Sequence, residues 1–100
     1  MIVVSGVLKM DPANHDAFAE LGKKMAASSM AEDGCVAYGF WADSHEPGVF
    51  RVFEEYADED ALNSHMGSPH FMEFLGSMGT VGITEASVDK YHVSEKAPLM

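Results

Sequence analysis

The sequence has one cysteine, few basic residues and no long apolar run. Because Cys35 is alone among 100 residues, an internal disulfide, a zinc ribbon and a CxxC redox pair are all excluded. The 6 basic residues face 16 acidic ones, and the formal net charge of -10 repels phosphate backbones and anionic lipid surfaces. We therefore expect no nucleic-acid partner, no membrane partner and a reducing, cytoplasmic location.

Signals for membrane insertion and export are also scarce. No stretch approaches the roughly 18 consecutive apolar residues of a membrane-spanning helix. Residues 1–10 alternate apolar and small residues without a basic first segment, so we expect no signal peptide. The sequence is 47% apolar, which is enough for one core in a chain of this length. We expect residues 1–100 to form one domain, with residues 94–100 as a C-terminal tail.

Local signals predict that a strand and then a helix begin the chain. Residues 2–8 are rich in β-branched side chains, and Asp11 and Pro12 then supply a helix cap and a first helical position. Apolar residues follow at spacings of three and four until Gly34, a typical stop signal. This pattern indicates an amphipathic helix of about five turns.

Residues 35–43 and 49–56 are aromatic and β-branched segments on either side of a turn, which predicts a β-hairpin. If the turn centres on Glu46, paired positions sum to 92. Neither face of this hairpin is polar throughout, so both need cover, and we expect a second subunit on one of them. The predicted pairs are Val36 with Tyr56, Tyr38 with Glu54, Phe40 with Val52, Gly39 with Phe53, and Trp41 with Arg51.

The second half of the chain predicts a broken helix and a last strand. Asp58 can cap a short helix that ends at Gly67, and Ser68 with Pro69 can start another. The glycine-rich residues 76–82 predict a loop, followed by a strand over about residues 83–93. The order βαββαβ predicts an α+β, ferredoxin-like fold with a four-stranded antiparallel sheet. The residues predicted to face inward are Leu62, His65 and Met66 in the first helix and Phe71, Phe74, Leu75 and Met78 in the second.

Two stretches of the chain carry a family resemblance. EDGCVAYGFWAD contains Gly34, Cys35 and Tyr38, and the stretch from residue 50 to 75 contains Glu54 and Tyr56 followed by the pattern H-x-x-SPHF. With these motifs the chain resembles the antibiotic biosynthesis monooxygenase family. The resemblance implies a homodimer, a dimeric α/β-barrel, with a pocket in each subunit between sheet and helices.

Family members with different activities have different residues at a few positions, and these positions can be compared with this sequence. Haem-degrading members have an asparagine on the first strand, a tryptophan after the third and a histidine on the later helix, where this chain has Ser5, Tyr56 and Leu75. An autoinducer phosphate isomerase of the family is also similar, but phosphate needs several convergent donors, and Arg51 is the only arginine. The resemblance therefore favours a cofactor-independent monooxygenase of a small quinol or phenolic, polycyclic aromatic substrate. The alternatives are an isomerase or proton-transfer enzyme for a small carbonyl compound, and a non-catalytic binder of a small hydrophobic ligand.

Catalysis is predicted for His65, with Glu54 and Tyr56 as its partners. Imidazole suits a general base because it titrates near neutral pH, and Glu54 could orient it or accept a hydrogen bond from a tyrosine. The structural alternatives are a core histidine bonded to a carbonyl or to Glu54, and a purely structural buried hydrogen bond. The predicted substrate contacts are Tyr38, Trp41, His70 and Phe71. The alternatives for these residues are core packing, helix capping or a dimer face.

We expect no cofactor and no metal. A suitable substrate, once deprotonated, gives an electron to O2 itself, so the protein supplies a base, a hydrogen bond and a dry pocket. His65 and His70 lack a third ligand at a diagnostic spacing, and Gly67 and Pro69 interrupt the helix between them. The predicted partners are thus a small apolar oxygenated organic substrate, O2 and a second copy of the chain.

Overall fold

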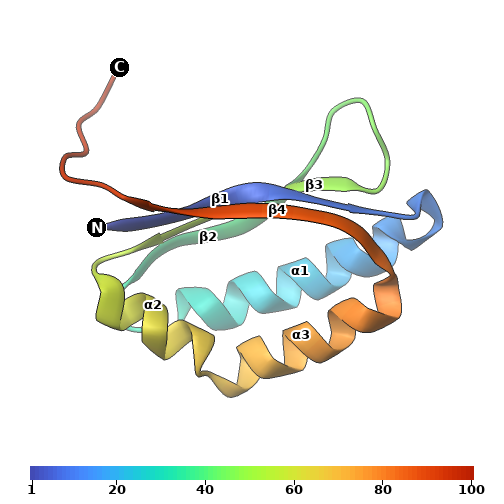
Figure 1. The fold of residues 1–100 in the computed structure, drawn as a ribbon, viewed down its shortest axis with the longest axis horizontal. Coiled ribbons are helices and arrows are strands. Elements are labelled where there is room, and N and C mark those ends of the chain that lie inside the picture. The colour runs from blue at the N-terminus through green and yellow to red at the C-terminus, as the bar shows by residue number, and fades with distance from the viewer.

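A computed structural model describes residues 1–100 as a four-stranded sheet with three helices on one face (Figure 1). All neighbouring strands are antiparallel, in the order β2-β3-β1-β4. This arrangement confirms the predicted α+β, ferredoxin-like class. In chain order the elements are β1 (Ile2–Met10), a 3-10 turn (Pro12–Asn14), α1 (His15–Met30), β2 (Cys35–Ala42), β3 (Val49–Tyr56), α2 (Glu59–Met66), α3 (Pro69–Val81) and β4 (Ile83–His92).

Helix starts follow the predicted caps, with one difference. The side chains of Asp58 and Ser68 each accept a hydrogen bond from the backbone amide three residues later. Asp11 also acts as a cap, but of the short 3-10 turn, and α1 itself begins at His15. The first helix is therefore shorter than the sequence predicts.

The glycine-rich segment 76–82 is helical as far as Val81, so the predicted loop there is wrong. A Cβ at Gly76 or Gly79 would meet nothing within 4 Å. Relative to alanine, each glycine costs the helix only about 1 kcal/mol of free energy. Gly82, with a φ of 65°, ends the helix in the left-handed conformation, and the Asn14 side-chain amide donates to the Val81 carbonyl at 2.8 Å. Packing and this cap outweigh the local glycine signal.

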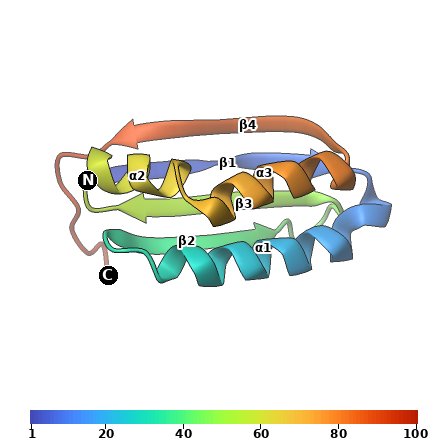
Figure 2. The same ribbon diagram turned by 90° about the horizontal axis from the view of Figure 1, so that it is seen from below.

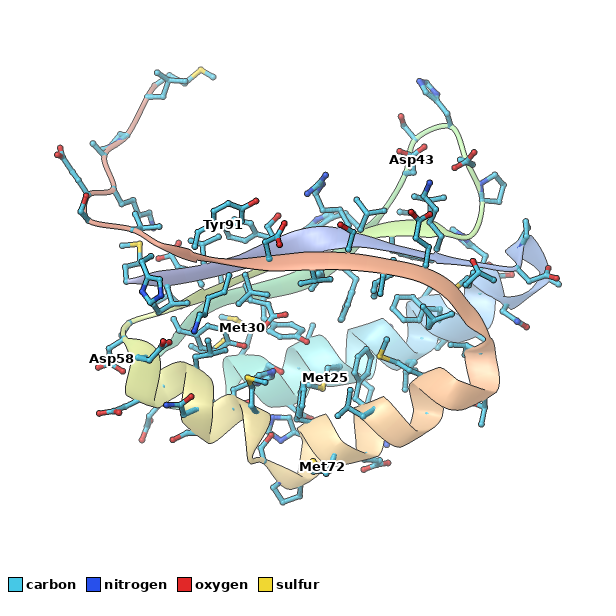
Figure 3. All side chains as sticks on the ribbon, in the orientation of Figure 1. Met25, Met30, Asp43, Asp58, Met72 and Tyr91 are labelled. Carbon is cyan, nitrogen blue, oxygen red and sulfur yellow. The ribbon has the colours of Figure 1, made fainter.

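The helices lie across one face of the sheet (Figure 2), and the core is between the two layers. Figure 3 shows Met25 in this layer, whereas Tyr91 lies on the other side of the sheet. Met66 and Leu75, predicted to face inward, are 50% and 47% exposed, so the buried stripe of each helix is narrower than predicted. None of the helices combines the length and the apolarity needed to cross a membrane. The main core consists of Leu8, Met10, Phe18, Met25, Phe50, Phe74 and Val81.

The β2–β3 hairpin has the predicted register over most of its length. Tyr38 lies opposite Glu54, and Trp41 lies opposite Arg51. A β-bulge between Cys35 and Ala37 places Cys35 opposite Tyr56, so the predicted Val36–Tyr56 pair is wrong. Val36 is the extra residue of the bulge and is 50% exposed.

The face of the sheet without helices is partly apolar. Strand alternation places Val3, Phe53 and Trp41 on this open face, together with the buried carboxylate of Glu55. Residues 94–100 form no helix or strand, and Lys96 lies 3.2 Å from both Glu55 oxygens. Apart from this segment and the β2–β3 turn, the open face is uncovered (Figure 1).

Candidate active site

His65, in the last turn of α2, is the buried centre of the candidate site, with an exposure of 1%. Its ring centroid lies 5.4 Å from those of Tyr38 and Tyr56, which come from β2 and β3. The rings of Phe71 and His70, from α3, lie at 5.2 and 6.0 Å. The fold therefore brings most of the predicted site residues around this one imidazole.

The corner between α2 and α3 holds His65 in place. The Ser68 hydroxyl donates to the His65 carbonyl at 2.6 Å and accepts from the Phe71 amide at 3.2 Å. Pro69 sets the first turn of α3. The motif H-x-x-SPHF thus forms a hydrogen-bonded corner that points His65 and His70 toward each other.

Glu32, in the turn after α1, bonds both histidines. Its Oε2 atom lies 2.8 Å from His65 Nδ1 and also contacts His70 Nε2. Its other oxygen, Oε1, is buried without a hydrogen-bond partner. Sequence reasoning did not select Glu32, which is 33 residues away from His65. The only signal was its place just before Gly34, in the turn that leads into β2.

Glu54 lies on the opposite side of the His65 ring. Its Oε1 atom is 3.8 Å from His65 Nε2, which is longer than a hydrogen bond, and it accepts the Tyr56 hydroxyl at 2.5 Å. Glu54 was predicted either to orient His65 or to accept a hydrogen bond from a tyrosine. The structure has the hydrogen bond from a tyrosine. The carboxylate that bonds the imidazole is Glu32 instead.

Burial determines the protonation of the groups around His65. It raises the pKa of Glu54 despite the opposing effects of the Tyr56 hydrogen bond and the His65 charge. Burial, followed by the nearby Glu54 charge, also raises the pKa of Tyr38 and Tyr56, so both hydroxyls are neutral donors at pH 7. Cys35 is a thiol rather than a nucleophilic thiolate, because burial raises its pKa to about 11.

A cavity of about 410 Å³ borders His65 and Glu54. Pockets of this size accommodate small organic ligands. At its border Lys90 of β4 reaches Glu59 of α2, with 2.9 Å between nitrogen and oxygen. The apolar part of its wall includes Val4, Leu62, Met66, Phe71 and Val88.

Unlike Phe71, neither His70 nor Trp41 lines this cavity. His70 borders a separate hollow of about 30 Å³ between α1 and α3. Trp41 is 56% exposed on the open face, and its ring covers Gly39, where a Cβ would come within 2.5 Å of it. This position agrees with the alternative that Trp41 belongs to a dimer face. The dimer itself stays a prediction.

Glu32, His65 and His70 also form a possible set of metal ligands. One ligand atom from each lies within 4.8 Å of the others, and two histidines with a carboxylate can hold a transition metal. Glu32 is the third ligand that sequence spacing did not reveal. One Glu32 oxygen already bonds both rings, so a cation would have to replace these contacts. The expectation of no metal stays a prediction.

Comparison with known proteins gives consistent matches. A family model described as antibiotic biosynthesis monooxygenase matches residues 1–76. An uncharacterised protein of Synechocystis sp. is 31% identical over 98 residues, which are 98% of this chain and 67% of that protein. A Mycobacterium tuberculosis protein, named provisionally as a monooxygenase, is 34% identical over 68 residues, or 68% of this chain and 66% of that protein.

Solved structures show the same fold. A crystal structure from Deinococcus radiodurans, described provisionally as an antibiotic biosynthesis monooxygenase, has a TM-score of 0.92. The alignment covers 100% of this chain and 99% of that one, at 22% sequence identity. At this identity the likeness is evidence for the fold alone.

Proposed function

Because the chain belongs to the antibiotic biosynthesis monooxygenase family, we propose that it is a cofactor-independent monooxygenase of a small quinol or phenol. One observation supports this most. His65 is held at Nδ1 by Glu32, while its Nε2 lies beside Glu54 at the wall of a cavity of about 410 Å³. An imidazole held in this way can take a proton from a substrate in largely apolar surroundings.

The proposed reaction begins when His65 Nε2 removes a proton from the substrate. The resulting electron-rich carbon transfers an electron to O2, and the two radicals combine into a C–O bond. His65 then returns its proton to the outer peroxide oxygen, and the O–O bond breaks as the carbon loses its second hydrogen, which leaves with the OH group as water. One CH2 group and one O2 thus become one C=O group and one H2O, and O2 is the only oxidant required.

Three further residues have proposed roles beside His65. Phe71 lines the cavity and would pack against an aromatic substrate. The raised pKa of Glu54 favours its protonated form, which can donate a hydrogen bond to a substrate oxygen. Tyr56 donates to Glu54 at 2.5 Å and holds that carboxyl group in place.

Oxygen uptake with dithranol, which carries such a CH2 group, tests this proposal. We expect uptake that depends on the protein, with the C=O compound as product. Saturable binding without uptake would favour the non-catalytic binder instead. Product formation from a small carbonyl compound without uptake would favour the isomerase.

We also propose that the active form is a cytoplasmic homodimer joined through the open face. This face carries Phe53 and Trp41 with no helix over it, and a single subunit would leave this apolar surface in water. Light scattering should show twice the subunit mass of 10.8 kDa, and Phe53→Glu should shift it toward the single mass. A wild-type protein of one subunit mass at micromolar concentration would contradict the dimer.

A further inference from the structure

We propose that Glu32 is the positioning residue of His65, and that His70 acts on this base through Glu32 rather than by touching the substrate. The inference rests on the proposed function, in which His65 is the base. It concerns two contacts with a single oxygen, Glu32 Oε2, made by His65 Nδ1 and His70 Nε2.

The first contact selects the tautomer of His65. An ionised carboxylate can only accept hydrogen bonds, so the 2.8 Å contact requires a proton on His65 Nδ1. A neutral imidazole carries one N–H, which leaves the lone pair on Nε2. Nε2 is the nitrogen on the side of Glu54, at 3.8 Å from its Oε1. Glu32 therefore turns the basic nitrogen toward the side where Glu54 borders the cavity.

The same contact supplies a counter-charge. When His65 takes a proton it becomes a cation with a side-chain exposure of 2%, and a buried cation without a partner is costly. No lysine or arginine bonds Glu32, and its Oε1 has no partner, so its charge is available to the imidazoles alone. Glu32 can therefore stabilise the protonated base, as the aspartate of a serine protease triad does.

His70 reaches the base only through this carboxylate. Its Nε2 contacts Glu32 Oε2, and its ring borders the hollow of about 30 Å³ rather than the cavity beside His65 and Glu54. With two donors on one oxygen, the position of the Glu32 carboxylate is determined by both rings. Removing His70 should therefore loosen Glu32 without removing a substrate contact.

One Glu32 variant tests the inference without a substrate. Long-range ¹⁵N–¹H spectra should show the Nδ1–H tautomer of His65 in the wild type, and Glu32→Ala should lose it because nothing then accepts the Nδ1 proton. Glu73→Gln is the control, since that carboxylate borders the hollow beside His70 but bonds Lys24 at 3.1 Å. An Nε2–H tautomer in the wild type, or an unchanged tautomer in Glu32→Ala, would overturn the positioning role.

Kinetics with dithranol test whether the negative charge of Glu32 supports the base. Glu32→Gln keeps an oxygen acceptor, so we expect a folded protein whose kcat falls by about tenfold to a hundredfold while KM stays close to the wild-type value.

A double-mutant cycle separates the two possible roles of His70. His70→Gln should lower kcat by itself but have no further effect in the Glu32→Gln background, because both changes break one connection. A raised KM, with losses that multiply, would mean that His70 binds the substrate directly. Absence of oxygen uptake by the wild type would refute the proposed function, whereas the tautomer measurement would still decide the role of Glu32.

Discussion

The two ends of the layer between sheet and helices have different chemistry. At one end Phe18 is fully buried, with its ring centroid 5.3 Å from that of Phe40 and 4.8 Å from that of Phe50. At the other end the equally buried His65 lies between the carboxyl groups of Glu32 and Glu54. We call these the phenylalanine end and the histidine end.

In our proposal, this difference separates stability from chemistry within one small fold. Packed rings gain free energy in proportion to the area that they bury, and they need no hydrogen-bond partner. Buried carboxylates and imidazoles lose hydration, so each depends on a specific partner. Changes at the phenylalanine end should therefore affect folding, and changes at the histidine end should mainly affect turnover.

The largest effect is expected at the phenylalanine end. Phe18→Ala should lower the free energy of unfolding by about 3–5 kcal/mol, because it leaves a cavity among three other phenylalanine rings. Urea denaturation measures this loss, and Phe18→Leu, which keeps more of the volume, should lose less. Turnover per folded molecule should stay close to the wild-type value. A folded Phe18→Ala protein with a specific loss of turnover would break the proposed separation.

His65→Ala is the matching change at the histidine end. We expect dithranol turnover to fall by about a hundredfold or more, and the free energy of unfolding to fall by about 1–3 kcal/mol because Glu32 loses a partner. The oxygen electrode and urea denaturation measure the two effects. If the variant unfolds early but turns over normally per folded molecule, His65 is structural, and Tyr56 or His70 becomes the next candidate.

Glu54→Gln should make the histidine end more stable at neutral pH. Burial holds the folded-state pKa of Glu54 above its ordinary value of 4.5. The stability that its neutral form contributes is therefore complete below that value and is lost as pH rises through the folded-state pKa. The variant should melt at a higher temperature than the wild type at pH 7, with little difference near pH 4.

The control for this pH dependence is Glu73→Gln, which changes an exposed carboxylate. Its melting temperature should follow that of the wild type at both pH values. Turnover of Glu54→Gln should fall by less than that of His65→Ala, because Nε2 keeps its lone pair. A Glu54→Gln protein that is less stable at pH 7 would contradict the stated effect of burial.

The smallest effect is expected from metal removal. In our proposal Glu32 bonds two imidazoles and no cation, so treatment with EDTA should leave both turnover and melting temperature unchanged. Purified protein should likewise show no Soret band. Loss of turnover in EDTA, restored by a transition metal, would assign Glu32, His65 and His70 to a metal site instead.

Local sequence signals determined most of the secondary structure of this protein. The caps at Asp58 and Ser68, the stop at Gly67 and the alternation of the hairpin each depend on a few neighbouring residues. These signals act within one turn of helix or one strand pair, so sequence reasoning could use them directly. Strand alternation also predicted that Tyr38 lies opposite Glu54, whereas the ring contacts of His65 with Phe71 and His70 came from the tertiary structure.

Only the tertiary structure decided which carboxylate bonds the imidazole and where the weaker local signals fail. Glu32 meets its two partners across 33 and 38 residues, because the end of α1 packs beside the α2–α3 corner, and no periodicity encodes that contact. Helix α3 continues through Gly76 and Gly79 because the packing of Phe74 and Val81 outweighs the glycine signal, and a cap ends it at Gly82. Long-range packing and the satisfaction of buried polar groups decide such features, and both depend on the complete fold.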